Sequence, residues 1–277
     1  MRHSIASASI RHLYWRTCRR VLAIRFVFQV RVAILSGIIL SAVVCPVAAQ
    51  DACRLAAIGV GTVAAVRDGR TLLLDDGREL RLAAIEVNDD SVAALQSLVA
   101  GRGLRLEKLG PEHDRYGRLT ALAYLDDKGP SVQQSMLEQG RARVSARIGN
   151  KACADLLLGA ERTARATRRG LWADPNFAPL RSQDTGRIAA ARGQFALVEG
   201  KVLSVRESGA TIYLNFGRHW THDFTATIPK RVRREFTAAG IDPKQLEGHP
   251  VRVRGWIEER GGPVMEVVAP EQIELTR

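Results

Sequence analysis

The sequence predicts a mostly β protein of the α+β class, folded as two domains that are joined by a linker. Residues 56–87 alternate in short apolar and polar steps, which is the two-residue period of strands. Three later segments carry apolar residues at helical spacing. A stretch without either period, Asp174–Gly193, then precedes a tail that is again strand-like.

The first domain, predicted over residues 54–174, combines strands with three helices. Residues 66–87 form two short strands around Asp75-Asp76-Gly77, a composition typical of a tight hairpin turn. Strand patterns resume on either side of the DRYGR segment, residues 114–118. The three helices are expected over Asp89–Ala100, Pro130–Gln139 and Lys151–Arg169.

The second domain is predicted over residues 194–277, after a linker of residues 175–193. Its pattern is three strand-like segments, a short helix and two more strand-like segments. This is the order of an OB barrel, a fold often used to hold single-stranded nucleic acid or oligosaccharide. We therefore expect an OB-like β-barrel at this end of the chain.

Residues 1–49 are expected to be a signal peptide for export. They contain seven arginines and no acid, and the apolar run Val32–Val44 and a small-residue end follow. We expect cleavage after Ala49 and a periplasmic or secreted protein; the alternative is a retained membrane anchor through residues 32–49. Without the seven arginines the formal net charge falls from +12 to +5. That balance permits a polyanionic partner without requiring one.

Cleavage would leave two of the four cysteines, Cys53 and Cys153. In an oxidising compartment such a pair is expected to form a disulfide, although two separate buried thiols are the alternative. The sequence has no CxxC motif and no cluster of cysteine and histidine, so it does not indicate a zinc site.

Five segments, in this order, resemble the staphylococcal nuclease or thermonuclease-like family: DGRT, RLAAIEVND, DRYGRLTALAYLDD, LEQGRARV and AERTARATRRGLW. The resemblance covers about residues 58–174, and DRYGR and the closing RRGLW are its most specific parts. It implies an OB barrel with three helices. It also implies a Ca²⁺-dependent phosphodiesterase acting on DNA and RNA, although many relatives keep the fold and lose the chemistry.

The resemblance assigns the two arginines that clamp the phosphate to Arg81 and Arg118. Guanidinium groups bind phosphate oxygens through forked hydrogen bonds and would stabilise charge in a transition state. The alternative is that both arginines form ion pairs with Glu86, Asp89 or Asp114 and hold the barrel together.

The acidic half of the family's site is altered in this sequence. The metal-binding turn Asp-Gly-Asp-Thr is Asp68-Gly69-Arg70-Thr71 here, and the second metal carboxylate is Glu86. The Pro-Glu pair that handles water is Asn88-Asp89. Calcium prefers several oxygen ligands, so a cation at position 70 predicts weak or absent calcium binding, with Arg70 paired to Glu86. If hydrolysis survives, Asp89 or Glu86 would handle the water.

Four further residues are candidates for binding nucleic acid: Tyr116, Trp220, Lys230 and Arg231. Tyr116 keeps one pocket tyrosine of the family, whereas the other is Ala146 here. Trp220 lies in the loop-like run RHWTH, and most other aromatic residues of the tail are expected in the core. Lys230 and Arg231 begin a basic run that could contact phosphates. The alternative is that this run is simply the solvent-exposed face of a helix.

The leading prediction is an exported protein that binds nucleic acid, single-stranded DNA or RNA, at a nuclease-derived site. Calcium-dependent hydrolysis is expected to be weakened or lost. The competing prediction is a non-catalytic envelope module whose C-terminal domain binds a protein or a glycan. No particular protein partner is indicated, and no stable membrane partner is expected beyond the N-terminal segment.

Overall fold

The computed structural model describes residues 53–276 of the chain. The predicted signal peptide or anchor, residues 1–49, lies outside this range. Within the described residues, no helix combines the length and apolar character needed to cross a membrane.

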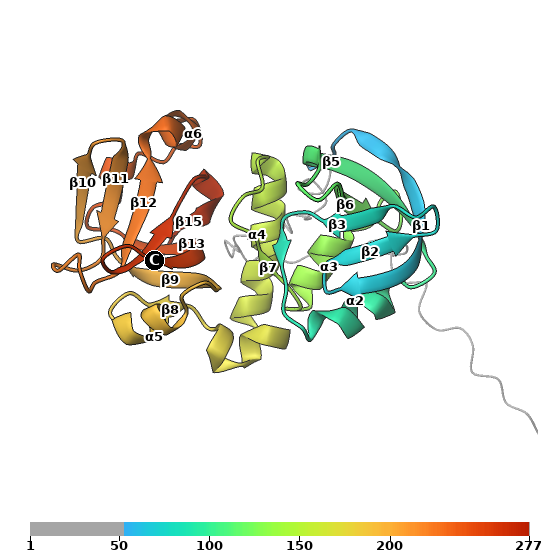
Figure 1. Ribbon diagram of the computed structural model, residues 1–277, viewed down its shortest axis with the longest axis horizontal. Coiled ribbons are helices and arrows are strands. Elements are labelled where there is room, and N and C mark those ends of the chain that lie inside the picture. Colours follow the sequence, from blue (N-terminus) through green and yellow to red (C-terminus); the bar gives the residue numbers. More distant parts are fainter. Residues whose placement is uncertain (1–52, 277) are drawn as a thin grey trace, which may run out of the picture. The chain divides into compact units, whose positions relative to one another are not determined.

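Five strands of the N-terminal half close into a barrel in the order β1-β2-β3-β6-β5 (Figure 1). They are β1 (Ala57–Asp68), β2 (Thr71–Leu74), β3 (Glu79–Leu82), β6 (Leu119–Tyr124) and β5 (Gly103–His113). Neighbours are antiparallel except β3 and β6, which are parallel. The alternating apolar residues of β2 and β3 fill the core, where Leu72 and Leu80 are fully buried.

Three helices accompany the barrel: α2 (Ser91–Val99), α3 (Val132–Glu138) and α4 (Lys151–Ala166). Each lies within a segment that the sequence predicted to be helical. The starts of α3 and α4 are fixed by side-chain caps, because Ser131 accepts from the Gln134 amide and Asn150 from the Cys153 amide. A short pair of strands, β4 (Ile85–Glu86) with β7 (Arg143–Val144), adds to this half.

Two glycines from separate motifs meet where α3 and α4 end. Both have positive φ, 65° at Gly140 and 53° at Gly170. A Cβ on Gly140 would lie 2.1 Å from the Arg169 carbonyl oxygen, and one on Gly170 would lie 2.3 Å from the Gly140 carbonyl oxygen. The Leu171 amide donates to that same Gly140 oxygen at 2.9 Å. The LEQG and RRGLW segments therefore need glycine because their backbones touch.

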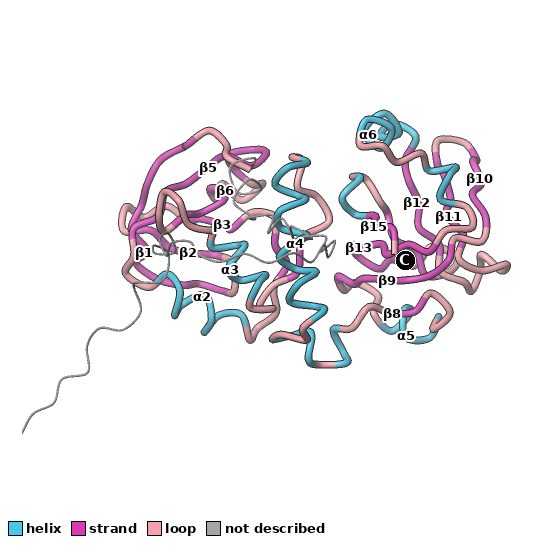
Figure 2. Tube along the Cα trace, turned by 180° about the vertical axis from the view of Figure 1, so that it is seen from behind, coloured by secondary structure: helices cyan, strands magenta, loops and turns pink. Residues whose placement is uncertain are grey.

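The C-terminal half is a mixed sheet in the order β10-β11-β12-β14-β13-β9-β8, with β15 beside β13 (Figure 2). The strands are β8 (Leu180–Arg181), β9 (Phe195–Lys201), β10 (Ser204–Ser208), β11 (Thr211–Asn215), β12 (Thr225–Pro229), β13 (Pro250–Glu259), β14 (Pro263–Glu266) and β15 (Ile273–Leu275). Its helices are α5 (Thr185–Ala190) and α6 (Arg233–Ala238), and 3-10 turns lie between elements.

The segment predicted as a linker, residues 175–193, has structure of its own. Its strand β8 runs parallel to β9, and Ile188 of α5 is fully buried in the core of the C-terminal half. Much of this segment therefore packs as part of that half.

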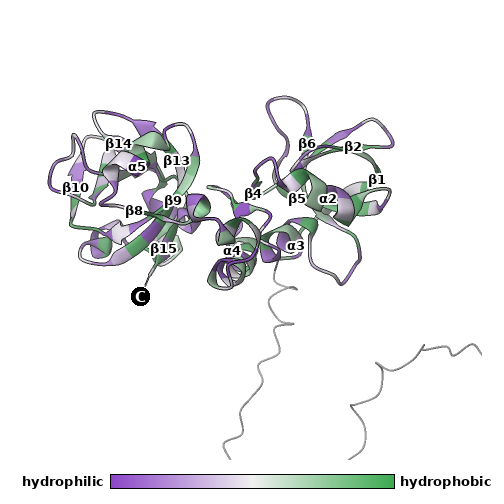
Figure 3. Ribbon diagram, turned by 90° about the horizontal axis from the view of Figure 1, so that it is seen from below, coloured by the Kyte–Doolittle hydropathy of each residue, from purple (hydrophilic) through white to green (hydrophobic). Residues whose placement is uncertain are grey.

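Each half has its own large hydrophobic core, and a small third cluster joins them. The third cluster consists of Ala164, Leu171, Trp172, Phe195 and Leu197, with Ala146 and Phe177 packed against it. In both halves the strands carry hydrophobic stretches, whereas the loops between them are largely hydrophilic (Figure 3).

Candidate functional site

Arg81 projects from β3 between two threonines on the neighbouring strands. It is in register with Thr71 of β2 and with Thr120 of β6, so the three side chains share one face of the barrel. Both threonine hydroxyls are buried without a hydrogen-bond partner. Among residues 53–276, no carboxylate oxygen lies within the 4.0 Å ion-pair distance of the Arg81 guanidinium. Its positive charge is therefore uncompensated by direct contact.

Arg70 fills the space beside Glu86. Its turn is set locally, because the Arg70 amide donates to the Asp68 carboxylate at 2.8 Å. Its Nη1 donates to the Glu86 carboxylate at 2.5 Å and to the Ile85 carbonyl oxygen at 2.9 Å. The structure thus shows the expected pairing of Arg70 with Glu86, and a guanidinium group satisfies the oxygens at this end of β4.

Arg118 is held by the first residue of its own motif. The Asp114 carboxylate accepts from the Tyr116 and Arg118 amides and closes the turn, in which Gly117 has a φ of 77°. The same carboxylate accepts from Arg118 Nε at 2.8 Å and Nη2 at 2.7 Å. Burial is the largest single influence on Asp114 and favours the neutral acid, but the hydrogen bonds from the Arg118 side chain and from the Tyr116 and Arg118 amides, with the charge of Arg118, together outweigh it and lower the pKa of Asp114.

The three arginines are close enough to influence one another electrostatically. Burial, followed by the charges of Arg70 and Arg118, lowers the pKa of Arg81. Glu86 and Asp68 act in the opposite direction but are outweighed. Because like charges and desolvation both disfavour the charged guanidinium, an anion bound here would relieve an existing electrostatic cost.

Tyr116 is exposed beside this cluster, with 66% of its surface accessible. The guanidinium carbons of Arg115 and Arg118 lie 4.7 and 5.1 Å from its ring centroid. With Arg118 it lines a pocket of about 300 Å³ next to the β2–β3 turn.

Asp89 is not drawn into the arginine cluster. It is exposed in the loop before α2, and no ion pair or side-chain hydrogen bond involves it in the range that the structure describes. Its neighbour Asn88 is used structurally, because Asn88 Oδ1 accepts from Ser91 Oγ at 2.8 Å. The water-handling role expected for Asp89 therefore has no positioned partner in this structure.

The donor set does not fit calcium well. No group of three or more His, Cys, Asp or Glu side chains suited to hold a metal ion occurs between residues 53 and 276. Of the two metal-binding positions that the resemblance implies, Glu86 accepts from Arg70, and position 70 itself carries the cation. A calcium ion would have to displace a guanidinium group from this carboxylate.

The other predicted binding residues belong to the C-terminal half. Lys230 forms an ion pair with Glu207 at 3.3 Å, and Arg231 is exposed. Trp220 is 68% exposed, as its loop-like sequence suggested. Trp256, expected in the core with most tail aromatics, is 48% exposed, because the alternation along β13 buries its neighbour Ile257 and points the indole to the other face, against Phe195.

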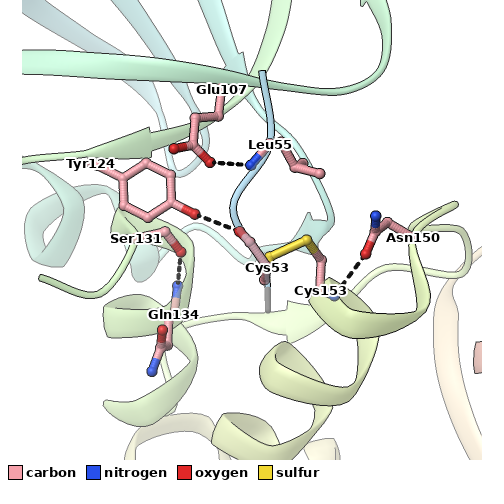
Figure 4. The surroundings of a disulfide bond; sticks show 8 residues. All are labelled: Cys53, Leu55, Glu107, Tyr124, Ser131, Gln134, Asn150 and Cys153. Atoms are coloured by element: carbon pink, nitrogen blue, oxygen red, sulfur yellow. Dashed lines mark hydrogen bonds between the residues drawn. A yellow bond between two sulfur atoms is a disulfide. The ribbon is translucent and has the colours of Figure 1, made fainter. Parts of the chain in front are cut away.

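Cys53 and Cys153 form a disulfide that ties the start of the described chain to the first turn of α4 (Figure 4). The Cα atoms lie 4.6 Å apart. Around it, the Leu55 amide donates to Glu107 at 3.0 Å and the Tyr124 hydroxyl donates to the Cys53 carbonyl at 3.4 Å. Burial, aided by the charge of Glu107, raises the pKa of Tyr124 to about 12. The bond is thus embedded in a packed, hydrogen-bonded region.

A buried ion pair behind β7 was not anticipated from the sequence. Arg254 of β13 donates through Nη1 and Nη2 to the two oxygens of Glu161 of α4, at 2.9 and 3.0 Å. Both also bind β7, since Glu161 accepts from the Val144 amide at 2.6 Å and Arg254 donates to the Val144 carbonyl at 3.2 Å. The signal available in the sequence was Glu161, an acid on the apolar face of α4, but its partner lies 93 residues away.

The closed five-strand barrel with its mixture of helices and strands fits an OB-type barrel. The family described as staphylococcal nuclease homologue matches residues 83–174. The resemblance stated above is thereby confirmed, and this part of the chain is a staphylococcal nuclease homologue domain. The matched range includes Glu86, Asp89 and Arg118 but begins after Arg81. A search of curated proteins found no match.

Proposed function

We propose that the nuclease homologue domain binds nucleic acid through a phosphodiester at Arg81 and Arg118, and that its calcium-dependent hydrolysis is weakened or lost. The observation that carries this proposal is the Arg70–Glu86 ion pair beside an unpaired Arg81. In this arrangement a nuclease-derived anion site keeps its two arginines, while Glu86 of its carboxylate half is already paired with a guanidinium group.

Arg81 is the stronger of the two phosphate ligands. It has no carboxylate to give up, whereas Arg118 must share its guanidinium with Asp114. A phosphodiester accepting from Arg81 gains a charge-assisted hydrogen bond and lowers the repulsion among the three arginines. Arg118 can contribute its remaining donors, and the exposed ring of Tyr116 offers a stacking surface beside it.

Calcium binding is opposed by charge as well as by ligand number. Two unit charges about 4 Å apart repel by roughly 4 kcal/mol at an effective dielectric of about 20, which is on the order of a thousandfold in affinity. Any residual hydrolysis would rely on Arg81 and Arg118 to stabilise the developing charge and on Glu86 or Asp89 to orient water.

The decisive experiment is digestion of plasmid and single-stranded DNA by the wild type and an Arg70→Asp variant, with calcium, other divalent ions or EDTA. We expect no calcium-stimulated cleavage by the wild type and a gain in the variant. Calorimetric titration should show tighter calcium binding by Arg70→Asp, with Arg70→Asp/Glu86→Gln as its control. Tight stoichiometric calcium binding by the wild type that depends on Glu86 would refute the proposal.

Binding is tested separately from cleavage. Single-stranded DNA should bind in a salt-sensitive manner, and Arg81→Ala/Arg118→Ala should weaken that binding. Trp220 is a separate candidate for binding nucleic acid, so every protein in this assay also carries Trp220→Ala. Undiminished binding by the double variant in that background would favour a scaffold role for the domain and the competing envelope-module function.

We further infer that the C-terminal half is a second OB-like barrel. Its pairing supports this: β10–β11, β11–β12, β14–β13 and β13–β9 are antiparallel, and β12–β14 is parallel. Only two residues separate β9 from β10, and the Leu203 amide there bonds to Asn215 of β11. Taking β9 and β10 as one bent strand gives the same order as the N-terminal barrel.

The disulfide supports export to an oxidising compartment, either the periplasm or the outside of the cell. Mass spectrometry of the mature protein tests whether residues 1–49 are removed or are retained as an anchor. A mature chain beginning at Gln50 supports cleavage.

A further inference from the structure

A groove of about 950 Å³ crosses the C-terminal half over β10, β11, β12 and β14. It shares no residue with the arginine cluster of the nuclease homologue domain. Neither the family match, which ends at residue 174, nor the proposed function accounts for it.

The strand register explains why this face is polar. Ile212, Leu214, Ala226 and Ile228 point into the core, so their alternates point outward. In the central row, Arg206 is opposite Tyr213, Tyr213 opposite Thr227, and Thr227 opposite Glu266. The row thus presents a guanidinium, a half-buried aromatic ring, a hydroxyl and a carboxylate in that order across four strands.

Trp220 is held at one end of this groove by a constrained loop. The Asp223 carboxylate accepts from the His219 amide at 2.7 Å. Gly217 lies against the same carboxylate, and a Cβ there would lie 2.0 Å from its oxygen. The indole rests on the β13–β14 turn, because a Cβ on Gly261 would lie 3.1 Å from the indole Cζ3. One face of the indole therefore packs against the β13–β14 turn, while 68% of the Trp220 surface stays exposed.

Positive charge dominates the lining. Arg206, Arg218 and Arg260 line the groove, and Glu266 is its only acid. Arg260 is paired with Glu258 at 2.6 Å. Within the described range, Arg206 and Arg218 form no ion pair. The register places Arg206 and Glu266 at opposite ends of the central row, so an anion can approach the arginine end without meeting the carboxylate.

We propose that this groove binds single-stranded nucleic acid. Unpaired bases stack on Trp220 and Tyr213, the phosphates contact Arg206 and Arg218, and Glu266 accepts from a base amino group. The groove should prefer a single strand to a duplex, because the bases of a duplex are stacked on one another and cannot stack on aromatic side chains. A neutral glycan would use the aromatic rings but leave two unpaired arginines without a counter-charge.

The test uses the full chain and a fluorescein-labelled oligodeoxycytidylate of about 12 nucleotides at low salt. Fluorescence anisotropy gives the affinity, and quenching of tryptophan fluorescence reports on the groove. Arg81→Ala/Arg118→Ala serves as the background, so the groove is measured without the other site. We expect saturable quenching in that background, which Trp220→Phe abolishes.

Trp220→Ala should weaken binding by about 5- to 150-fold, the range measured for loss of one stacked base. Arg206→Ala/Arg218→Ala should lower the slope of log affinity against log salt by about 1.4, since each single-strand phosphate contact contributes about 0.7. Arg187→Ala, an exposed arginine of α5 outside the groove, is the matched control and should change neither quantity.

Three results would overturn the proposal: no quenching at low salt, affinity unchanged by Trp220→Ala, or preference for duplex or a neutral oligosaccharide of similar length. If quenching is absent but binding still depends on Arg81, the groove proposal is wrong and the proposed function stands. If quenching is present but binding does not depend on Arg81 and Arg118, the proposed function is wrong and the groove proposal stands.

Discussion

Arg70 and Arg81 carry the same charge in one small region but meet different surroundings. Arg70 is satisfied by the Glu86 carboxylate and the Ile85 carbonyl oxygen, so it substitutes for a bound cation. Arg81 lies between two threonines and two other arginines and has no such partner. Sequence motifs identified both residues, but only the contacts within residues 53–276 show that Arg70 has an ion-pair partner and Arg81 does not.

At the same scale, Asp114 is predicted to stabilise the protein in a pH-dependent way. Its folded pKa lies below the unfolded value of 3.8, so its contribution is fully present above that value. It is lost as the pH falls through the lower folded pKa. Asp114→Asn should reduce the free energy of unfolding by about 1–3 kcal/mol at pH 7, because a charged hydrogen-bond acceptor is removed.

Urea unfolding of wild type and Asp114→Asn, measured from neutral to strongly acidic pH, tests this expectation. The difference between the two proteins should shrink below pH 3.8. Asp126→Asn, in an exposed loop, is the matched control and should differ little from wild type at any pH. A pH-independent deficit in Asp114→Asn would assign the effect to turn geometry instead of charge.

At the scale of elements, segments with strong local signals were predictable. The helices α3 and α4 have capping side chains and apolar periodicity, and both were located from the sequence. By contrast, β8 and α5 contain only two and six residues, too few to show a period. They form because β9 and the second core lie beside them, so the predicted linker was assigned too little structure.

The candidate sites divide in the same way. The motifs singled out Arg81, Arg118 and Glu86 as candidates, and the predicted pairing of Arg70 with Glu86 is present in the structure. They did not indicate the groove, because its central row brings together four strands whose register cannot be read from one sequence. The position of Ala146 in the third cluster was equally hidden, since its neighbours include Phe195 from the other half.

The disulfide gives an element-scale prediction. It closes a loop with a sequence separation of 100 residues, for which the chain-entropy model gives about 4–5 kcal/mol of stabilisation. Cys53→Ser/Cys153→Ser should therefore unfold at clearly lower urea concentration than wild type. Dithiothreitol should bring the wild type to the same midpoint and leave the double variant unchanged. Equal midpoints before reduction would contradict the expected contribution.

At the scale of the whole molecule, the two halves are joined by buried charge as well as by the third apolar cluster. Burial opposes the charge on Arg254, but Glu161 and Glu274 outweigh it and raise the pKa of Arg254. The pair also fixes Val144 of β7, which is in register with Ile85 of β4. A residue of the C-terminal half thus supports the strand that presents Glu86.

Arg254→Met should destabilise the protein by about 3–5 kcal/mol, because it removes one partner of a buried ion pair and leaves carboxylates facing an apolar group. The matched control is Arg162→Met, whose side chain is 52% exposed and lies 3.6 Å from Glu274. That change should cost less than about 1 kcal/mol. Thermal and urea unfolding of both variants measure the difference, and similar losses would show that burial of the pair is unimportant.

The Glu161–Arg254 contact also constrains the order of events during synthesis. Residues 53–174 leave the ribosome well before Arg254, which follows Glu161 by 93 positions. During that interval the inward-facing carboxylate has Arg165 nearby but lacks its forked partner. The nuclease homologue domain is therefore fully synthesised before the arginine that pairs with its buried Glu161 is available.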